Sequence, residues 1–185
     1  WQVHGNKIIQ VNQPRGLGNP PEKADGLMTN RRSITLFMRF ADCVPILLCD
    51  PVKGVVGIFH AGWKGTLRKI VNRGVKVFRE DYNSNTDDIV AGIGPSICAE
   101  HYVIKDDVAT LVRKTFKTET AEVLTTSKSG IHLNLAKANQ IILQQSGVKK
   151  IEFSDICTAC DTGKWFSHRA ENGATGRFGA YIALQ

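Results

Sequence analysis

The stretch ADCVPILLCDPVKGVVGIFHAGWKG, residues 41–65, decides the fold. Two short apolar runs, residues 44–48 and 55–59, are rich in β-branched or bulky side chains and lie between turn-forming residues, which predicts two buried strands. Residues 50–54 are too few for a crossover helix, so the strands should pair antiparallel. Such a hairpin brings Cys43, before the first strand, close to His60, at the end of the second. A thiol and an imidazole are thus predicted to meet at one sheet edge.

Small residues follow this edge. Ala61, Gly62 and Gly65 come directly after His60 and allow a backbone or a ligand to approach closely. We expect a helix over residues 66–81, and the N–H groups of its first turn would form an anion site near Gly65.

Composition indicates one globular domain over residues 1–185, since 42% hydrophobic residues support one sizeable core. No apolar run is long enough to span a bilayer, and no signal-peptide pattern opens the chain. The net charge of +7 comes from scattered residues, which favours a solvated basic surface over a nucleic-acid site. Five cysteines without a disulfide pattern indicate a reducing, cytoplasmic location.

The remaining sequence mixes strands and helices without strict βαβ alternation. Apolar patterns predict strands at residues 1–11, 34–40, 89–93, 120–124, 151–156 and 178–184. Residues 12–23 read as a loop, and residues 24–30 as a short bridge with a turn at Asp25. Asp106 is expected to cap a second helix with Val108, Leu111, Val112 and Phe116 inward, and a third helix spans residues 133–145 and stops at Gly147. We expect a mixed, largely antiparallel sheet covered by helices.

Cys43 and His60 admit three interpretations: a Cys–His nucleophilic pair, two ligands of a metal site, or a buried thiol beside a structural histidine. His4, in the segment QVHG, is the natural third ligand. Two His and one Cys suit Zn²⁺ with a fourth position open for water or substrate, which is the catalytic pattern, and the same set could hold copper. Asp42, beside Cys43, is a candidate proton carrier.

Other polar residues give weaker signals. Cys157 and Cys160 form a CxxC without a second such pair, so we interpret them as structural. Cys98 has no evident partner, and neither His101 nor His132 lies in a motif. Lys64 and Arg177 are candidate phosphate contacts.

Several motifs together resemble one known family. They are QVHG at residues 2–5, ADCVP at 41–45, HAGWKGT at 60–66, IGPSI at 93–97, YV at 102–103, CT at 157–158 and TGR at 175–177. The likeness covers nearly the whole chain and is with the laccase-domain family, also called the multicopper polyphenol oxidase or purine nucleoside phosphorylase family. Members carry a further segment before the QVHG motif, so we expect this chain to lack an N-terminal family segment.

The resemblance implies an α/β/α sandwich similar to the catalytic domain of cytotoxic necrotizing factor toxins, and a metal site of His4, Cys43 and His60. It implies either copper-dependent oxidation of phenols, or zinc-dependent phosphorolysis of adenosine, inosine and methylthioadenosine with adenosine deamination. Five histidines and no His-x-His pair cannot build a four-copper oxidase. A single open zinc site can polarise a carbonyl or a water, so we prefer nucleoside chemistry with purine nucleoside and phosphate as partners.

Two alternatives remain at this stage. In a metal-free amide hydrolase, Cys43 would be the nucleophile and His60 its base, which leaves His4 without a role. A non-enzymatic module would bind metal or a partner without turnover of any nucleoside.

Overall fold

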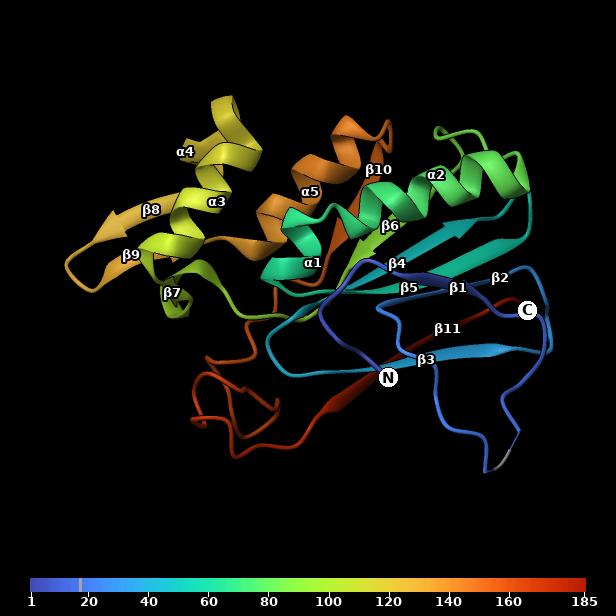
Figure 1. Ribbon diagram of the computed structural model, residues 1–185, viewed down its shortest axis with the longest axis horizontal. Coiled ribbons are helices and arrows are strands. Elements are labelled where there is room, and N and C mark those ends of the chain that lie inside the picture. The colour runs from blue at the N-terminus through green and yellow to red at the C-terminus, as the bar shows by residue number, and fades with distance from the viewer. Residues whose placement is uncertain (17) are drawn as a thin grey trace.

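The computed structural model describes residues 1–16 and 18–185. Strands and helices alternate irregularly along the chain, as Figure 1 shows. The strands are β1 Ile8–Gln10, β2 Gly26–Thr29, β3 Thr35–Phe40, β4 Val44–Asp50, β5 Val55–Ala61, β6 Val90–Ile93, β7 Val103–Ile104, β8 Leu124–Ser127, β9 Gly130–Leu133, β10 Lys150–Phe153 and β11 Phe178–Ala183. The helices are α1 Trp63–Leu67, α2 Ile70–Tyr82, α3 Asp106–Phe116, α4 Thr120–Val123 and α5 Leu135–Gln145, with 3₁₀ turns at Ala99–His101 and Lys117–Glu119.

The hairpin of β4 and β5 lies at the centre of a six-stranded sheet with the order β1-β2-β5-β4-β6-β10. The pairs β2–β5, β4–β5 and β4–β6 are antiparallel, whereas the edge pairs β1–β2 and β6–β10 are parallel. The predicted antiparallel hairpin and mixed sheet are therefore confirmed. The register pairs Val44 with Ala61, so Cys43 comes next to Gly62 at the same end of the hairpin as His60.

The turn of this hairpin is built by a buried carboxylate. One oxygen of Asp50 accepts hydrogen bonds from the backbone N–H groups of Val52 (2.8 Å) and Lys53 (2.9 Å). Gly54 then takes a φ of 62°, a conformation that L side chains rarely adopt. Both strands are buried on both faces, which explains why they read as continuous apolar runs.

The two faces of the sheet are covered differently (Figure 1). Helices α1, α2 and α5 lie over one face, where Val55, Phe59 and Ala61 of β5 enter the larger core. The antiparallel ribbon of β3 and β11 lies over the other, where Val56 and Ile58 enter a smaller core. Among the described residues the second layer is thus a β-ribbon and not the helix layer of the expected α/β/α sandwich.

The strand expected over residues 1–11 is shorter than predicted. Only Ile8–Gln10 pairs, because the backbone before it bends around Asp25, whose carboxylate accepts N–H groups from Val3, His4 and Gly5. His4 has a φ of 59°, which no strand residue adopts. The bridge expected over residues 24–30 contains β2, which lies between β1 and β5.

The helix predicted over residues 66–81 is two helices. Lys69 is left-handed, with a φ of 55°, and separates α1 from α2. We had expected the N-terminus of this helix near Gly65. Because α1 begins at Trp63, Gly65 instead lies inside the helix. In α3 the cap is Lys105 and not Asp106, and Leu111 is 47% exposed, so its predicted inward position is wrong.

The secondary structure predicted for residues 120–133 is also wrong, because the β-branched residues in this segment favour a strand where a helix forms. The strand expected at residues 120–124 is mostly the short helix α4, whose Val123 is buried. The strand β9 was not expected, and it pairs with β7 and β8 in a separate three-stranded sheet. Among the described residues, no helix combines the length and the apolar character that crossing a bilayer requires.

Candidate metal centre

His4, Cys43 and His60 converge at the end of the central hairpin, and we call them the three-residue cluster. Their ligand atoms all lie within 4.8 Å of one another, and the two imidazole centroids are 4.8 Å apart. His60 is buried, Cys43 is partly buried and His4 is exposed. The set of one thiol and two imidazoles, open on the side of His4, fits a tetrahedral zinc ion that keeps one position free.

Asp25 orients the residues of this cluster through hydrogen bonds to His4 and His60. From the sequence we had interpreted Asp25 only as a turn residue. It is fully buried, and its Oδ1 lies 2.8 Å from His60 Nδ1, which leaves Nε2 of that ring for the cluster. Its oxygens also accept the N–H groups of His4 at 2.9 Å and Gly5 at 2.7 Å. One carboxylate therefore orients two of the three residues, as carboxylates beside metal-binding histidines commonly do.

The electrostatics of the cluster favour a thiolate. Burial alone would raise the pKa of the Cys43 thiol, but hydrogen bonds and charge from His4 and His60 outweigh it and lower the pKa to about 7. Burial would lower the pKa of His60, but the Asp25 carboxylate and the Cys43 sulfur raise it to about 9. A deprotonated sulfur is the form that binds a metal ion.

Gly62 leaves the space that the cluster occupies. A Cβ atom at this position would lie 2.7 Å from Cys43 Sγ and 3.1 Å from the Cδ2 atom of His4. Any side chain here would push against two of the three residues. The small residues noted after His60 are thus required by close packing at the site.

An open cleft of about 2260 Å³ is lined by the three-residue cluster and by residues from distant parts of the chain. Of the other candidate residues, Asp42 and Arg177 line this cleft, whereas Lys64 is not among its lining residues. The ammonium group of Lys64 instead lies 5.5 Å from the ring centroid of Trp63. Arg177 donates hydrogen bonds from Nη1 to the carbonyl oxygens of Thr175 and Gly176, so its position depends on the loop that carries it.

Asp42 connects the hairpin to the loop of residues 154–177. Its Oδ1 accepts hydrogen bonds from the hydroxyls of Thr158 and Ser167, both at 2.7 Å, and its Oδ2 accepts the backbone N–H of Arg169 at 2.6 Å. Its own backbone is left-handed, with a φ of 81°. These contacts favour a positioning role, and the predicted role of Asp42 as proton carrier stays a prediction.

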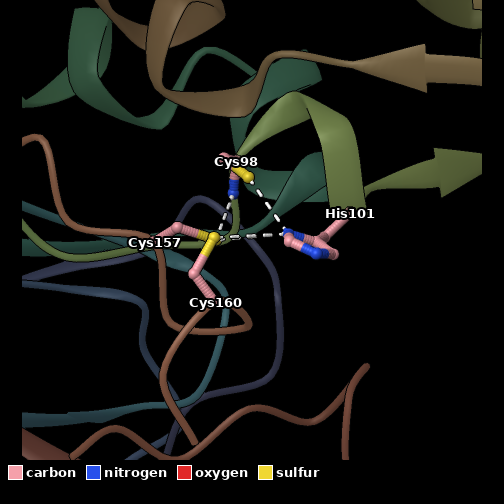
Figure 2. Close-up of side chains that lie close together, drawn as sticks. All are labelled: Cys98, His101, Cys157 and Cys160. Carbon is pink, nitrogen blue, oxygen red and sulfur yellow. Dashed lines mark hydrogen bonds between the residues drawn. The ribbon is translucent and has the colours of Figure 1, made fainter.

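A second group of ligand atoms lies outside this centre. Cys98, His101, Cys157 and Cys160, the four-residue cluster, also have ligand atoms within 4.8 Å of one another, and Figure 2 shows the four side chains pointing toward one another. The partners of the CxxC pair were missed because they lie almost sixty positions earlier in the sequence. The only signal was the matching spacing of Cys98 and His101, three positions apart.

Comparisons with known proteins show which family the chain is similar to. The profile of the family described as "Multi-copper polyphenol oxidoreductase laccase" matches residues 1–185. "Purine nucleoside phosphorylase YlmD" of Bacillus subtilis is 38% identical, over 100% of this chain and 69% of that protein. "Purine nucleoside phosphorylase" of Deinococcus radiodurans is 35% identical, over 99% of this chain and 68% of that protein. The crystal structure of YlmD from Geobacillus stearothermophilus matches with a TM-score of 0.93 and 35% identity, over 100% of this chain and 72% of that one.

Proposed function

The chain belongs to the laccase-domain family, in which its similar relatives are named purine nucleoside phosphorylases, and on that premise we propose that it cleaves purine nucleosides with phosphate at the three-residue cluster. The proposed substrates are adenosine, inosine and methylthioadenosine. The observation that carries the proposal is the convergence of His4, Cys43 and His60 at the wall of an open cleft.

The cluster would hold one zinc ion through the Cys43 sulfur and one nitrogen from each histidine. Zinc supplies a Lewis acid that stabilises negative charge developing on a substrate oxygen or nitrogen. Asp25 holds the His60 ring through Nδ1 and fixes the turn that carries His4, so the ligands are oriented before substrate arrives.

The reaction needs a cation beside the attacking anion. An oxygen of hydrogen phosphate forms a bond to ribose C1′ while the bond from C1′ to the purine nitrogen breaks, and the leaving purine takes up the proton that the hydrogen phosphate gives up. Arg177, on the cleft wall, is our candidate for binding phosphate. Lys64 is the weaker candidate, because it lies outside the cleft lining.

Adenosine deamination and copper-dependent phenol oxidation are further activities proposed for the same site. Deamination needs a proton carrier, and Asp42 can serve only if its carboxylate gives up some of the hydrogen bonds that it accepts. An assay with adenosine and phosphate separates the reactions, because phosphorolysis releases adenine and deamination yields inosine.

The test compares His4→Ala, Cys43→Ala and His60→Ala with the wild type. Each variant should lose the metal bound at the three-residue cluster together with nucleoside turnover, and double variants should be no worse, because the residues act as a unit. Cys49→Ala is the matched control, since Cys49 lies in β4 outside both clusters.

The thiol-nucleophile alternative makes a different prediction for the same variants. If His4→Ala keeps most of the turnover and a chelator leaves the wild type active, Cys43 is a nucleophile and the metal mechanism is wrong. If the wild type binds metal tightly and forms neither adenine nor inosine, the chain is a binding module.

A further inference from the structure

The four-residue cluster joins two segments that are far apart in the sequence. Cys98 caps the 3₁₀ turn that carries His101, and Cys157 and Cys160 belong to the loop that follows β10. Figure 2 shows the side chains entering one shared space from these two segments. The cluster shares no residue with the three-residue cluster.

The distances from the imidazole nitrogen to the three sulfurs match a tetrahedral zinc site. His101 Nδ1 lies 3.3 Å from the Cys98 sulfur, 3.7 Å from that of Cys157 and 3.6 Å from that of Cys160. In a tetrahedron with Zn–S of about 2.3 Å and Zn–N of about 2.0 Å, nitrogen and sulfur are about 3.5 Å apart. The three observed distances fall on both sides of this value.

The two segments are held in register by backbone contacts. Ser96 bonds to both neighbours of Cys157: its N–H donates to the carbonyl oxygen of Ile156, and its carbonyl oxygen accepts the N–H of Thr158, both at 3.1 Å. The backbone N–H of Cys98 also donates to the Cys157 sulfur at 3.2 Å, a contact that stabilises a thiolate. The ligands are thus positioned by the fold itself.

The 3₁₀ turn has its own support. His132 lies buried behind it and its Nδ1 donates a hydrogen bond to the carbonyl oxygen of Ala99 at 2.8 Å. The opposite nitrogen, Nε2, lies 2.8 Å from the hydroxyl of Ser127. A histidine without any motif in the sequence therefore positions the segment that carries two of the four ligands.

The loop of residues 154–177 is long and has little regular structure to hold it in place. It connects β10 to β11 without a helix or a longer strand, only an isolated bridge at Cys157, and it lines the cleft with His168, Arg169 and Arg177. Long loops without regular structure are uncommon in compact domains unless they are functional or tied down. Asp42 holds the loop through Thr158, Ser167 and Arg169, and the four-residue cluster lies near the start of the loop.

We propose that Cys98, His101, Cys157 and Cys160 bind one Zn²⁺ ion as a structural site, which fastens the cleft-lining loop of residues 154–177 to the core. Three thiolates and one imidazole form a complete four-ligand set, which is the closed pattern of structural zinc and leaves no position for substrate. Soft sulfur ligands disfavour Mg²⁺ and Ca²⁺, and the imidazole favours zinc over an iron–sulfur cluster.

The experiment uses a background that cannot fill the other site. The double variant His4→Ala/Cys43→Ser removes two of the three ligands of the three-residue cluster. Purified under reducing conditions, it should still contain one zinc per chain by elemental analysis. After exchange to cobalt, it should show the visible bands of a tetrahedral site with thiolate charge transfer. Adding Cys98→Ser should remove both signals, and adding Cys49→Ser should remove neither.

Several results would overturn this proposal. A folded background variant that binds neither zinc nor cobalt excludes the site, even if the Cys98→Ser variant cannot be purified. A disulfide between any two of the three cysteines in the non-reduced mass spectrum also excludes it. In the background variant, zinc removal should also increase hydrogen exchange across residues 154–177, and unchanged exchange would exclude the fastening role. None of these measurements depends on nucleoside turnover, so the two proposals fail separately.

Discussion

Replacing Asp25 with asparagine tests whether one buried carboxylate organises the metal centre. The side chain is fully buried and accepts hydrogen bonds from the N–H groups of Val3, His4 and Gly5 and from the ring of His60. Asparagine has the same shape but only one acceptor oxygen. If the asparagine oxygen accepts from His60 and His4, its NH₂ group faces the N–H of Gly5. Both of these groups are donors, so the hydrogen bond to Gly5 is lost.

The magnitude follows from these contacts. Hydrogen bonds to a charged group contribute about 1.5–3 kcal/mol, and neutral ones about 0.5–1.5 kcal/mol. Loss of the charge and of at least one bond should therefore lower the free energy of unfolding of the metal-free protein by about 2–4 kcal/mol. Losing the partner of a metal-binding histidine should weaken metal affinity by about 10- to 100-fold.

The pH dependence of stability provides a second readout in the metal-free protein. The pKa of His60 is raised from 6.5 to about 9, so its pairing with Asp25 contributes fully below pH 6.5 and is lost as the pH rises through about 9. The wild type should lose this contribution over that interval. Asp25→Asn removes the partner, so its stability should change less over the same interval.

The assay is urea unfolding of metal-free protein across this pH range, together with competitive zinc titration. Asp50→Asn is the matched control, because Asp50 is also a fully buried carboxylate but lies at the far end of the hairpin. One oxygen of Asp50 accepts both turn bonds, so its amide can keep them. Asp50→Asn should leave metal affinity unchanged. A folded Asp25→Asn protein with wild-type metal affinity and stability would refute the reasoning.

Three further predictions concern packing and reactivity. Gly62→Ala should weaken metal binding at an energetic cost of about 1–3 kcal/mol, because its Cβ would lie 2.7 Å from the Cys43 sulfur, and wild-type affinity in a zinc titration would contradict this. In metal-free protein, the rate at which Cys43 reacts with iodoacetamide should rise with pH with a midpoint near its pKa of about 7, and zinc should protect it. Peptide mass spectrometry measures both effects, and a midpoint near pH 9 would argue against the histidine contacts. Gly74→Ala places a Cβ 2.6 Å from Cζ of Phe59, so the cost of overpacking, about 1–3 kcal/mol, should exceed the gain from the helix preference for alanine, about 0.5–1 kcal/mol. Urea unfolding measures the change in stability, and a variant more stable than the wild type would show that the ring can move.

The sequence predicted the centre of the fold because its signals there are local. The apolar runs of β4 and β5 and the short turn at Asp50 allow only an antiparallel pairing, and the pairing places Cys43 beside His60. His4, named as the third ligand from its place in the segment QVHG, precedes β1 and could not be placed beside the hairpin by spacing alone. Helices and strands with strong periodicity, such as α5 and β11, were also predicted with nearly correct ends.

Errors occurred where long-range contacts override local preference. The strand expected at the N-terminus is bent by the carboxylate of Asp25, and the expected long helix is broken at Lys69 by a left-handed backbone that no sequence pattern indicates. The short helix α4 forms because Val123 packs into the core, although the residues around it favour a strand. The bend around Asp25 and the packing of Val123 both depend on residues far from the segment itself.

The sequence by itself therefore determined the hairpin, the mixed sheet and the three residues of the predicted catalytic cluster. Only the tertiary structure decided which groups support them. Asp25 reaches His60 because β2 lies beside β5, and Cys98 and His101 reach the CxxC pair because the segments after β6 and β10 run side by side. Sheet order is a property of the whole chain, since it is set by how all the apolar faces can be buried together. Residues brought together by sheet order share no local pattern that the sequence could reveal.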